Sequence, residues 1–432
     1  MIRQLSIVLF TGLTALTAIA QNPAPKSWYR GDIHVHRNCG EGSLFISEDS
    51  LKKMMAVNDL QLISLLADMG NGEVKDNKTD LPKVNGKDAP QTTAGRIVHW
   101  DAEWHWDATY SAFEHQALGG HLVLLGLKTA KQVWAESPYK ILDWSRQQGA
   151  ITGFAHLQYL ADTIQSTLNC CIPLDLPVEA ALGTLDFASE DVYSASMPKG
   201  GYNSEAAIHA YYKLLNCGFK LGLAAGTDFP CNDKEPLGNL LTYVQVKGAL
   251  SYAKWIDGIR KGKTVISRRG NREFLDLVIN DKFQPGDQVR LNKKDSLAAR
   301  IEWTSGSETG GTIELVVNGE ITGTITGTAK PGQPLVLSTK IPINKSSWVI
   351  ARRMDSREHI THTAPVYINL EGRPIRARKK DAAYFIKWID NLLEKIQPGG
   401  PWHHYFPNDL EAVQARYKKA REIYTKIRDE SE

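Results

Sequence analysis

The chain has 432 residues, which is more than one ordinary domain needs and enough for two or three domains. Hydrophobic residues make up 42% of it and charged residues 23%, values that are typical of a globular protein and exclude a disordered or low-complexity chain. The formal net charge is +3 and no basic run is present, so we expect no nucleic acid partner.

The first twenty residues predict an export signal. Arg3 gives a positive start, the stretch 5–20 is apolar and small, and Ala18-Ile19-Ala20 has the spacing of a cleavage site. A short membrane anchor is the alternative, but the apolar run is brief and carries three threonines. No later segment is long and apolar enough to span a membrane. We therefore expect a mature protein without a membrane span, in the periplasm or secreted.

Segments with strand and helix patterns alternate from Asp32 to about Ser267. The first strand candidate, GDIHVH, has an alternating apolar pattern. The later candidates are near-continuous apolar runs, as expected of strands buried on both faces, and they are LQLISLLAD, HLVLLGL, GAITGFAH, LDFASE and LGLAAGTD. A helix is predicted over 47–58 with Ser47 as its N-cap, and others over YKILDWSRQQ and EAAIHAYYKLLNCG. This alternation favours a parallel α/β architecture, either an open sheet or a barrel.

The pattern changes near Arg268. From there to about Leu370 the chain shows short alternating segments between Gly, Asn and Asp residues, with an Asn-Gly hairpin signal in VVNGEI, which predicts a small antiparallel β-sandwich. Two amphipathic segments follow, DAAYFIKWIDNLLEKI and DLEAVQARYKKAREIYTKI, and both predict helices. We expect this pair to pack back on the first part, because Trp388, Trp402 and Tyr405 need cover; a freestanding helical hairpin is the alternative.

The first strand candidate carries two histidines two residues apart. Side chains at i and i+2 of a strand point to the same side, so His34 and His36 project together. Two imidazoles at a strand end can offer nitrogen ligands to a metal. A lone H-x-H pair is nevertheless a weak signal and also fits two surface or core histidines.

Other strand candidates also place metal-competent residues at their ends. In parallel α/β folds, functional groups collect where the strands run into loops at the carboxyl edge. The residues at these positions are Asp68, Glu103, His121 (at the start of its segment), His156 and Asp228. Convergence of so many segments is hard to obtain by chance, so the sequence predicts a metal centre at this edge.

The order of these motifs resembles the PHP (polymerase and histidinol phosphatase) superfamily, and within it the CehA/McbA-type metallohydrolases. GDIHVH is similar to the family's first motif, SLLAD to the second, AEWHWD with GGHLVLLGL to its Glu-then-His motif, GFAH to its isolated histidine and AAGTD to its last motif. The resemblance covers about residues 28–270 and implies a distorted (β/α)7 barrel with metals at the carboxyl end of its strands. The implied ligands are His34, His36 and Asp228 for one metal, His121 and His156 for another, and Glu103 as a bridge between them.

The chain departs from the family pattern at three places. Glu41 stands where the first motif usually has an aspartate, Met69 where the second has a histidine, and Pro230 where the last has a histidine. Methionine and proline cannot replace imidazole for a hard or borderline divalent ion. We therefore expect two divalent metal ions, Zn, Mn or Fe, and no third.

The chain has five cysteines, and they are Cys39, Cys170, Cys171, Cys217 and Cys231. An oxidising compartment permits disulfides, while an odd count leaves at least one thiol over unless a second chain supplies a partner. Cys39 and Cys231 stand three residues after His36 and Asp228, next to the altered motifs. Two alternatives stay open: the two cysteines form a disulfide, or they are unrelated small residues.

Two further residues are assigned roles in catalysis. Asp68, if it is not a ligand, can orient a ligand histidine or accept a proton. Arg37 can meet an anionic group such as phosphate, or it is a loop arginine that pairs with Glu41. His99 and His105 are reserve ligands by strand parity, although we favour rim positions for both.

Three functions remain open. The leading one is a hydrolase in which two divalent ions activate a hydroxide to cleave phosphoesters, or carboxylic or carbamic esters and amides, of a small-molecule substrate for which an anionic group is one option. The second is an amidohydrolase-like enzyme, although no lysine ends a central strand here. The third is a non-catalytic extracytoplasmic binding protein on a PHP scaffold. The expected parts of the chain are a signal peptide at 1–20, the PHP-like barrel at 21–270, the β-sandwich at 271–370 and a C-terminal helical segment at 371–432.

Overall fold

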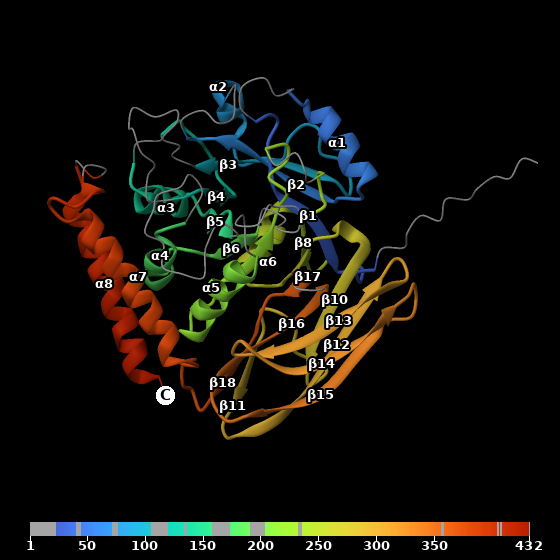
Figure 1. Cartoon of the computed structure of the whole chain (residues 1–432). Helices are drawn as coiled ribbons and strands as arrows, with labels where there is room; N and C mark the ends of the chain where they lie inside the picture. Colours follow the sequence, from blue (N-terminus) through green and yellow to red (C-terminus); the bar gives the residue numbers. More distant parts are fainter. Residues whose placement is uncertain are drawn as a thin grey trace, which may run out of the picture.

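The computed structural model shows a large mixed sheet with helices in its first part, a strand-rich part, and two long helices at the end (Figure 1). The residues that the structure describes are 23–39, 45–70, 77–104, 120–133, 136–157, 173–190, 204–231, 236–355, 358–403, 406 and 408–431. Several sequence predictions lie outside these residues, namely the export signal, Glu41, His105, Tyr405 and the Cys170-Cys171 pair.

The first three strands run side by side in the same direction. They are β1 (Trp28–Val35), β2 (Leu62–Asp68) and β3 (Ile97–Trp104). The register of the parallel pair β2 and β3 places Asp68 next to Glu103, so the last residues of these strands stand at the same edge. Every residue of β2 is buried, as its near-continuous apolar pattern predicts.

The fourth strand runs against its neighbours. β4 (Leu122–Leu125) is antiparallel to β3 and to β5 (Ile151–Phe154), while β6 (Phe187–Glu190) and β7 (Gly222–Ala225) continue in parallel with β5. The parallel architecture that the sequence predicts therefore does not hold at β4. Because β4 is reversed, its first residue lies at the carboxyl edge of its neighbours, and His121 directly precedes that residue.

Helices connect most of these strands. They are α1 (Glu48–Val57), α2 (Asn77–Asp80), α3 (Pro138–Gln147), α4 (Leu176–Leu182), α5 (Ser204–Asn216) and α6 (Tyr252–Arg260), with short 3₁₀ turns η1 (Leu81–Lys83) and η4 (Gly270–Arg272). The predicted N-cap of α1 is confirmed, because Oγ of Ser47 accepts a hydrogen bond from the backbone N of Ser50 at 3.1 Å.

The chain after β7 returns to the end of β1. Phe229 forms an isolated parallel bridge with Val35, and its carbonyl oxygen accepts a hydrogen bond from the backbone N of His36 at 2.6 Å. Gly226 fits so closely here that an added Cβ would lie 2.6 Å from the Cβ of His34. The first and last strands of the first part therefore meet at the edge that carries the predicted ligands. A closed (β/α)7 barrel goes beyond these contacts and stays a prediction.

The sheet continues from the first part into the strand-rich part. β8 (Leu241–Gln245) is antiparallel to β1 and to β9 (Thr264–Ser267), and β9 pairs with β17 (Glu358–Thr363). The other strands are β10 (Glu273–Ile279), β11 (Gln288–Leu291), β12 (Asp295–Ser305), β13 (Thr309–Val317), β14 (Glu320–Ala329), β15 (Leu335–Ile343), β16 (Ser347–Asp355) and β18 (Val366–Leu370). β10, β12 and β15 form a separate three-stranded antiparallel sheet. Because hydrogen bonds join β8, β9 and β17 across residue 270, the four-part division of the chain stays a prediction.

The predicted hairpin in VVNGEI is confirmed. Val317 pairs with Glu320 at the ends of β13 and β14, and Asn318 and Gly319 form the turn with φ values of 51° and 82°. Positive φ at both central residues is what a type I′ turn requires, and Asn-Gly is the pair that adopts it most readily.

The last two helices pack back on the first part, as the sequence predicts. α7 (Lys379–Ile396) contacts α4 and the segment before it, where Nε1 of Trp388 donates to the carbonyl of Leu174 at 3.1 Å. α8 (Leu410–Glu430) reaches the same helix through the hydroxyl of Tyr424, which donates to the carbonyl of Pro177 at 2.8 Å. Trp388 and Trp402 are both buried, so the cover that these side chains need is present.

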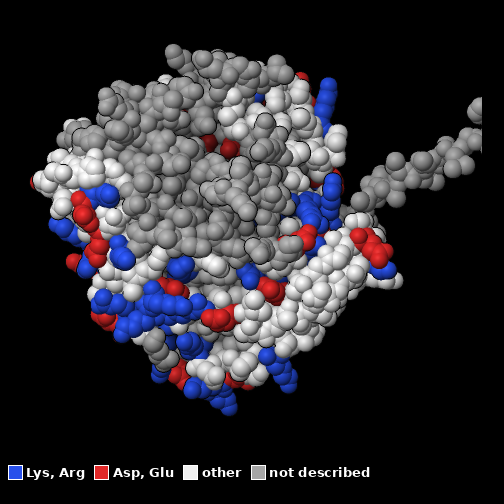
Figure 2. Space-filling view, in the orientation of Figure 1, with Lys and Arg blue, Asp and Glu red and all other residues white. Residues whose placement is uncertain are grey.

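Charged side chains of both signs lie on the surface. In Figure 2, Lys and Arg gather at the lower left, over α7, α8 and their border with the strand-rich part, with acidic side chains between them. Across the part of the chain that the structure describes, none of the helices combines the length and apolar character that crossing a membrane takes.

Candidate metal centre

The end of β1 directs two imidazoles to the same point. A register shift between Asp32 and Val35 marks an irregularity of the bulge type, which redirects side chains. The Nε2 atoms of His34 and His36 lie 3.2 Å apart, and both side chains are buried. Nδ1 of His36 donates to the carbonyl oxygen of Leu66 at 3.0 Å, so Nε2 is the nitrogen of the neutral ring that can bind a metal.

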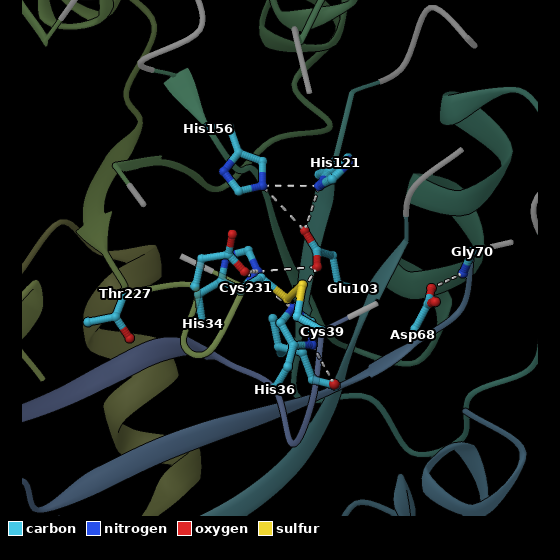
Figure 3. A network of polar contacts seen from close by, with 12 residues as sticks. His34, His36, Cys39, Asp68, Gly70, Glu103, His121, His156, Thr227 and Cys231 are labelled. Atoms are coloured by element: carbon cyan, nitrogen blue, oxygen red, sulfur yellow. Dashed lines mark hydrogen bonds and ion pairs between the residues drawn. A yellow bond between two sulfur atoms is a disulfide. The ribbon is translucent and has the colours of Figure 1, made fainter. Parts of the chain in front are cut away.

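Glu103 and Asp228 approach the same two nitrogens (Figure 3). Oε2 of Glu103 lies 3.2 Å from Nε2 of His34 and 2.9 Å from Nε2 of His36. Oδ1 of Asp228 lies 3.3 Å and 3.6 Å from the same two atoms. We call the Nε2 atoms of His34 and His36, Oε2 of Glu103 and Oδ1 of Asp228 the first group.

Five distances within the first group are close to the edge length of a coordination tetrahedron. In a tetrahedral site with metal–ligand bonds of about 2.0–2.1 Å, the ligand atoms stand roughly 3.3–3.4 Å from one another. The five distances given above run from 2.9 to 3.6 Å. The two imidazoles therefore fit around a single divalent ion together with Glu103, and they also fit around one together with Asp228.

A second group shares Glu103 with the first. Oε1 of Glu103 lies 3.1 Å from Nδ1 of His121 and 3.7 Å from Nε2 of His156, and these two nitrogens lie 3.0 Å apart. The reversed direction of β4 brings His121 beside the end of β3, and His156 comes just after β5. Figure 3 shows the Glu103 carboxylate between the two groups, with one oxygen directed at each.

Two of these residues have a backbone conformation that L-residues rarely adopt. The φ angle is 57° at His156 and 54° at Asp228. Such a conformation costs on the order of 1–3 kcal/mol and persists where the surroundings impose it, which is often at functional sites. The strain thus falls on one residue of each group.

Asp32 ties the ends of β1 and β7 together. Its Oδ1 accepts hydrogen bonds from the backbone N of His34 at 3.1 Å and of Thr227 at 3.0 Å. Its Oδ2 accepts from Oγ1 of Thr227 at 2.5 Å and from the backbone N of Gly238 at 3.2 Å. Burial raises the pKa of Asp32 to about 6, although these hydrogen bonds favour the carboxylate. Sequence reasoning missed this residue, and its place in GDIHVH, two residues before His34, was the one available signal.

The two carboxyl groups of the centre differ in acidity. Burial by itself raises the pKa of Glu103, but the attraction of His34 and His121 and the hydrogen bonds from His121 and His156 outweigh it and hold that pKa well below its usual range. Burial raises the pKa of Asp228 to about 6. The nearby histidines lower this pKa by attraction, and Glu103 raises it by repulsion. Two carboxylates that repel each other inside a buried site are what a bound cation would stabilise.

Asp68 stands next to Glu103 in the sheet but is directed elsewhere. Its Oδ1 accepts a hydrogen bond from the backbone N of Gly70 at 2.6 Å, and Figure 3 shows its carboxylate apart from the imidazoles. Among the described residues, Asp68 belongs to none of the groups of three donors that could hold a metal. The neighbouring Met69 is fully buried in the hydrophobic core.

Arg37 makes contacts away from both groups. Its Nη1 donates to Oδ1 of Asp80 at 2.7 Å, its Nε donates to the carbonyl of Ile46 at 3.2 Å, and its guanidinium lies 3.8 Å from the centre of the Phe45 ring. The side chain is 10% exposed. These contacts hold the guanidinium in place, and a role of Arg37 toward an anionic substrate stays a prediction. Its partner is Asp80, which the sequence did not indicate.

His99 is separate from the centre. Its Nδ1 donates to Oδ1 of Asp88 at 2.8 Å, and its ring stacks on Tyr252 with centroids 3.6 Å apart. The sequence favours a rim position for His99 over a role as a metal ligand, and these contacts agree with that preference.

Cys39 and Cys231 form a disulfide, with their Cα atoms 4.8 Å apart. The disulfide joins the segment after His36 to the segment after Asp228, and it settles the alternative that the sequence left open. Cys217 is a free thiol and is buried.

No protein-family model and no curated protein matches the chain. Among solved structures, a two-domain protein from Bacteroides vulgatus, described as containing a predicted PHP-like metal-dependent phosphoesterase, aligns with 81% of this chain and 97% of its own at 13% identity and a TM-score of 0.41. The CARDB domain of a Pyrococcus furiosus protein in complex with di-metal ions aligns with 23% of this chain and 89% of its own at 16% identity and a TM-score of 0.17. At these TM-scores, neither likeness establishes the fold or the function of this chain.

Proposed function

We propose that the chain is a metal-dependent hydrolase with two divalent ions, one in each group. The observation that carries this proposal is the convergence of four buried imidazoles on the two oxygens of Glu103, at distances between 2.9 and 3.7 Å. Imidazole and carboxylate donors suit Zn, Mn and Fe alike, so the donor set fits all three. Ions bound at the two groups would lower the pKa of a water molecule and polarise the bond to be cleaved.

The two groups suit different tasks. The first group offers four protein donor atoms, one more than the second. The second group offers three, which is the usual number in catalytic sites where one position stays open. We therefore infer that the first group holds its ion firmly and that the substrate approaches the ion of the second group.

The protein's own residues orient these donors. The carbonyl of Leu66 fixes the tautomer of His36, and Asp32 holds the backbone of His34. Asp68 stays our candidate for orienting a ligand histidine or accepting a proton, because it ends the strand next to Glu103 without belonging to either group.

The motif order supports the finer proposal that the chain is a PHP-type enzyme of the CehA/McbA kind with a distorted (β/α)7 barrel. The proposed substrates are small phosphoesters, or carboxylic or carbamic esters and amides. The leader pattern supports a periplasmic or secreted location. Met69 in the core and Pro230 after Asp228 support two ions without a third.

The test is an activity screen of the metal-reconstituted protein with p-nitrophenyl phosphate, bis-p-nitrophenyl phosphate, and aryl acetate and carbamate esters. We expect turnover that depends on added metal and is lost in a His34→Ala/His36→Ala double variant. His209→Ala is the matched control, since His209 lies exposed on α5. Failure of the wild type both to turn over any ester and to bind metal would overturn the proposal and favour a binding protein.

A further inference from the structure

Cys231 lies beside the first group of the metal centre. Its Sγ, a ring nitrogen of His36 and a carboxylate oxygen of Asp228 all lie within 4.8 Å of one another. Figure 3 shows the sulfur–sulfur bond near His36. A potential sulfur ligand is therefore present at the first group, but it is bound in a disulfide.

We propose that the Cys39–Cys231 disulfide withholds a thiolate from the first group, and that reduction turns Cys231 into a ligand of the ion held there. This inference rests on the proposed function, because it requires an ion in the first group. It adds to that function a redox control of the ligand set.

The chemistry depends on the state of the sulfur. A disulfide sulfur carries no charge, whereas a thiolate is a strong ligand for zinc and for other borderline ions. A dithiol reductant supplies two electrons and two protons: the bond between Cys39 and Cys231 breaks, two thiols form, and the reductant closes to a cyclic disulfide. Cys231 then releases its proton to solvent as its sulfur binds the ion.

The two half-cystines differ in their surroundings. In the part of the chain that the structure describes, Cys231 belongs to a group of three potential donors and Cys39 belongs to none. Both residues are half-buried, so a small dithiol can reach the bond. The free thiol of Cys217 is no substitute, because it is 1% exposed and also belongs to no such group among the described residues. The structure therefore singles out one sulfur.

The consequence concerns the resting state of the centre. An oxidising compartment, which the leader pattern predicts, maintains the disulfide, and the first group then offers nitrogen and oxygen donors alone. A thiolate would add negative charge and a sulfur donor at the first group. Reduction thus changes the ligand set of the ion held there.

Cobalt(II) binding separates the two claims, with cobalt as the probe. Visible d–d absorption reports that cobalt is bound, and a near-ultraviolet charge-transfer band reports a thiolate on cobalt. The samples are the oxidised wild type, the wild type reduced with a dithiol that is removed under nitrogen, Cys39→Ser and Cys231→Ser. The two variants are matched, because each lacks the disulfide and differs from the other only in which sulfur is left.

We expect d–d absorption in all four samples. The charge-transfer band is expected at one thiolate per chain in the reduced wild type and in Cys39→Ser, and to be absent in the oxidised wild type and in Cys231→Ser. A band of equal size in Cys231→Ser, or no band in Cys39→Ser while cobalt is bound, would overturn the inference and leave the proposed function standing. Loss of the d–d absorption from the oxidised wild type would overturn the proposed function itself.

Discussion

Three of the four residues of the first group are positioned by contacts that need no metal. The carbonyl oxygen of Leu66 accepts a hydrogen bond from Nδ1 of His36, and the carboxylate of Asp32 accepts one from the backbone N of His34. Asp32 also binds Thr227, the residue before Asp228. Outer contacts of this kind fix the tautomer and direction of a metal ligand, so their removal weakens metal binding without touching the ligands.

Replacement of Asp32 by Asn tests this role. An amide offers one acceptor oxygen where the carboxylate offers two, and its NH₂ would face the donors of Thr227 or Gly238. We expect metal affinity to fall about 10- to 100-fold, as for other outer ligands, and the free energy of unfolding to fall by about 1–3 kcal/mol. The measurement is competition with a chromophoric chelator. Asp88→Asn is the control, because Asp88 accepts from His99 away from the centre; equal affinities of the two variants would contradict the role.

Gly226→Ala tests the close contact between the end of β7 and His34. An added Cβ would lie 2.6 Å from the Cβ of His34 and 2.7 Å from its backbone N, so one of the two segments has to move. We expect the metal affinity of the first group to fall at least about 10-fold. Overpacking should also lower the free energy of unfolding by about 1–3 kcal/mol. Gly310→Ala provides the control, since the nearest atom to its added Cβ is 4.0 Å away. A Gly226→Ala protein that binds metal as tightly as Gly310→Ala would show that the contact does not position His34.

At the scale of elements, the direction of β4 decides how the second group forms. A strand that ran parallel to its neighbours would place His121 at the opposite edge of the sheet, away from Glu103. The sequence shows the histidine at the start of its segment but not the direction of the strand, because direction depends on pairing with β3 and β5. Local signals such as the Ser47 cap and the Asn-Gly turn were predictable, since each depends on neighbouring residues alone.

The contact between α4 and α8 contains buried acidic groups. Oδ1 of Asp175 accepts from the hydroxyl of Tyr417 at 2.5 Å, and Glu179 pairs with Arg416 at 2.5 Å. Burial, together with the repulsion of Glu179, raises the pKa of Asp175 from its ordinary 3.8 to about 7. The folded protein therefore keeps a proton on Asp175 at pH values where the unfolded chain has lost it.

This shift predicts how stability depends on pH. Between about pH 4 and pH 7 the folded state binds more protons at Asp175 than the unfolded state, so the free energy of unfolding falls as the pH rises through this range. The contribution is on the order of 4 kcal/mol and is fully lost above the folded pKa. Asp175→Asn keeps an acceptor for Tyr417 but cannot titrate, so it should lose less stability than the wild type between pH 5 and pH 8. Urea unfolding at several pH values measures the free energy of unfolding of both proteins. The prediction is contradicted if this free energy changes with pH in the same way for the wild type and the variant.

At the scale of the whole molecule, the centre lies where distant parts of the chain meet. The first group combines β1, the end of β3 and the segment after β7, and the Cys39–Cys231 disulfide closes the same edge across 192 residues of sequence. The sequence indicated the candidate donors, because H-x-H and acidic strand ends are visible as local patterns. It could not indicate what Asp32 and Gly226 contact or which residue pairs with Arg37, since these contacts join segments far apart in the chain.

The most direct test of the account is a count of metal ions by emission spectroscopy on reconstituted protein of known concentration. We predict two equivalents for the wild type and about one for His156→Asn and for Asp228→Asn, in which asparagine tolerates the positive φ that both positions have. Glu103→Gln should weaken both sites, because it removes the charge that the two groups share. Three tightly bound equivalents, or none, in the wild type would contradict the account.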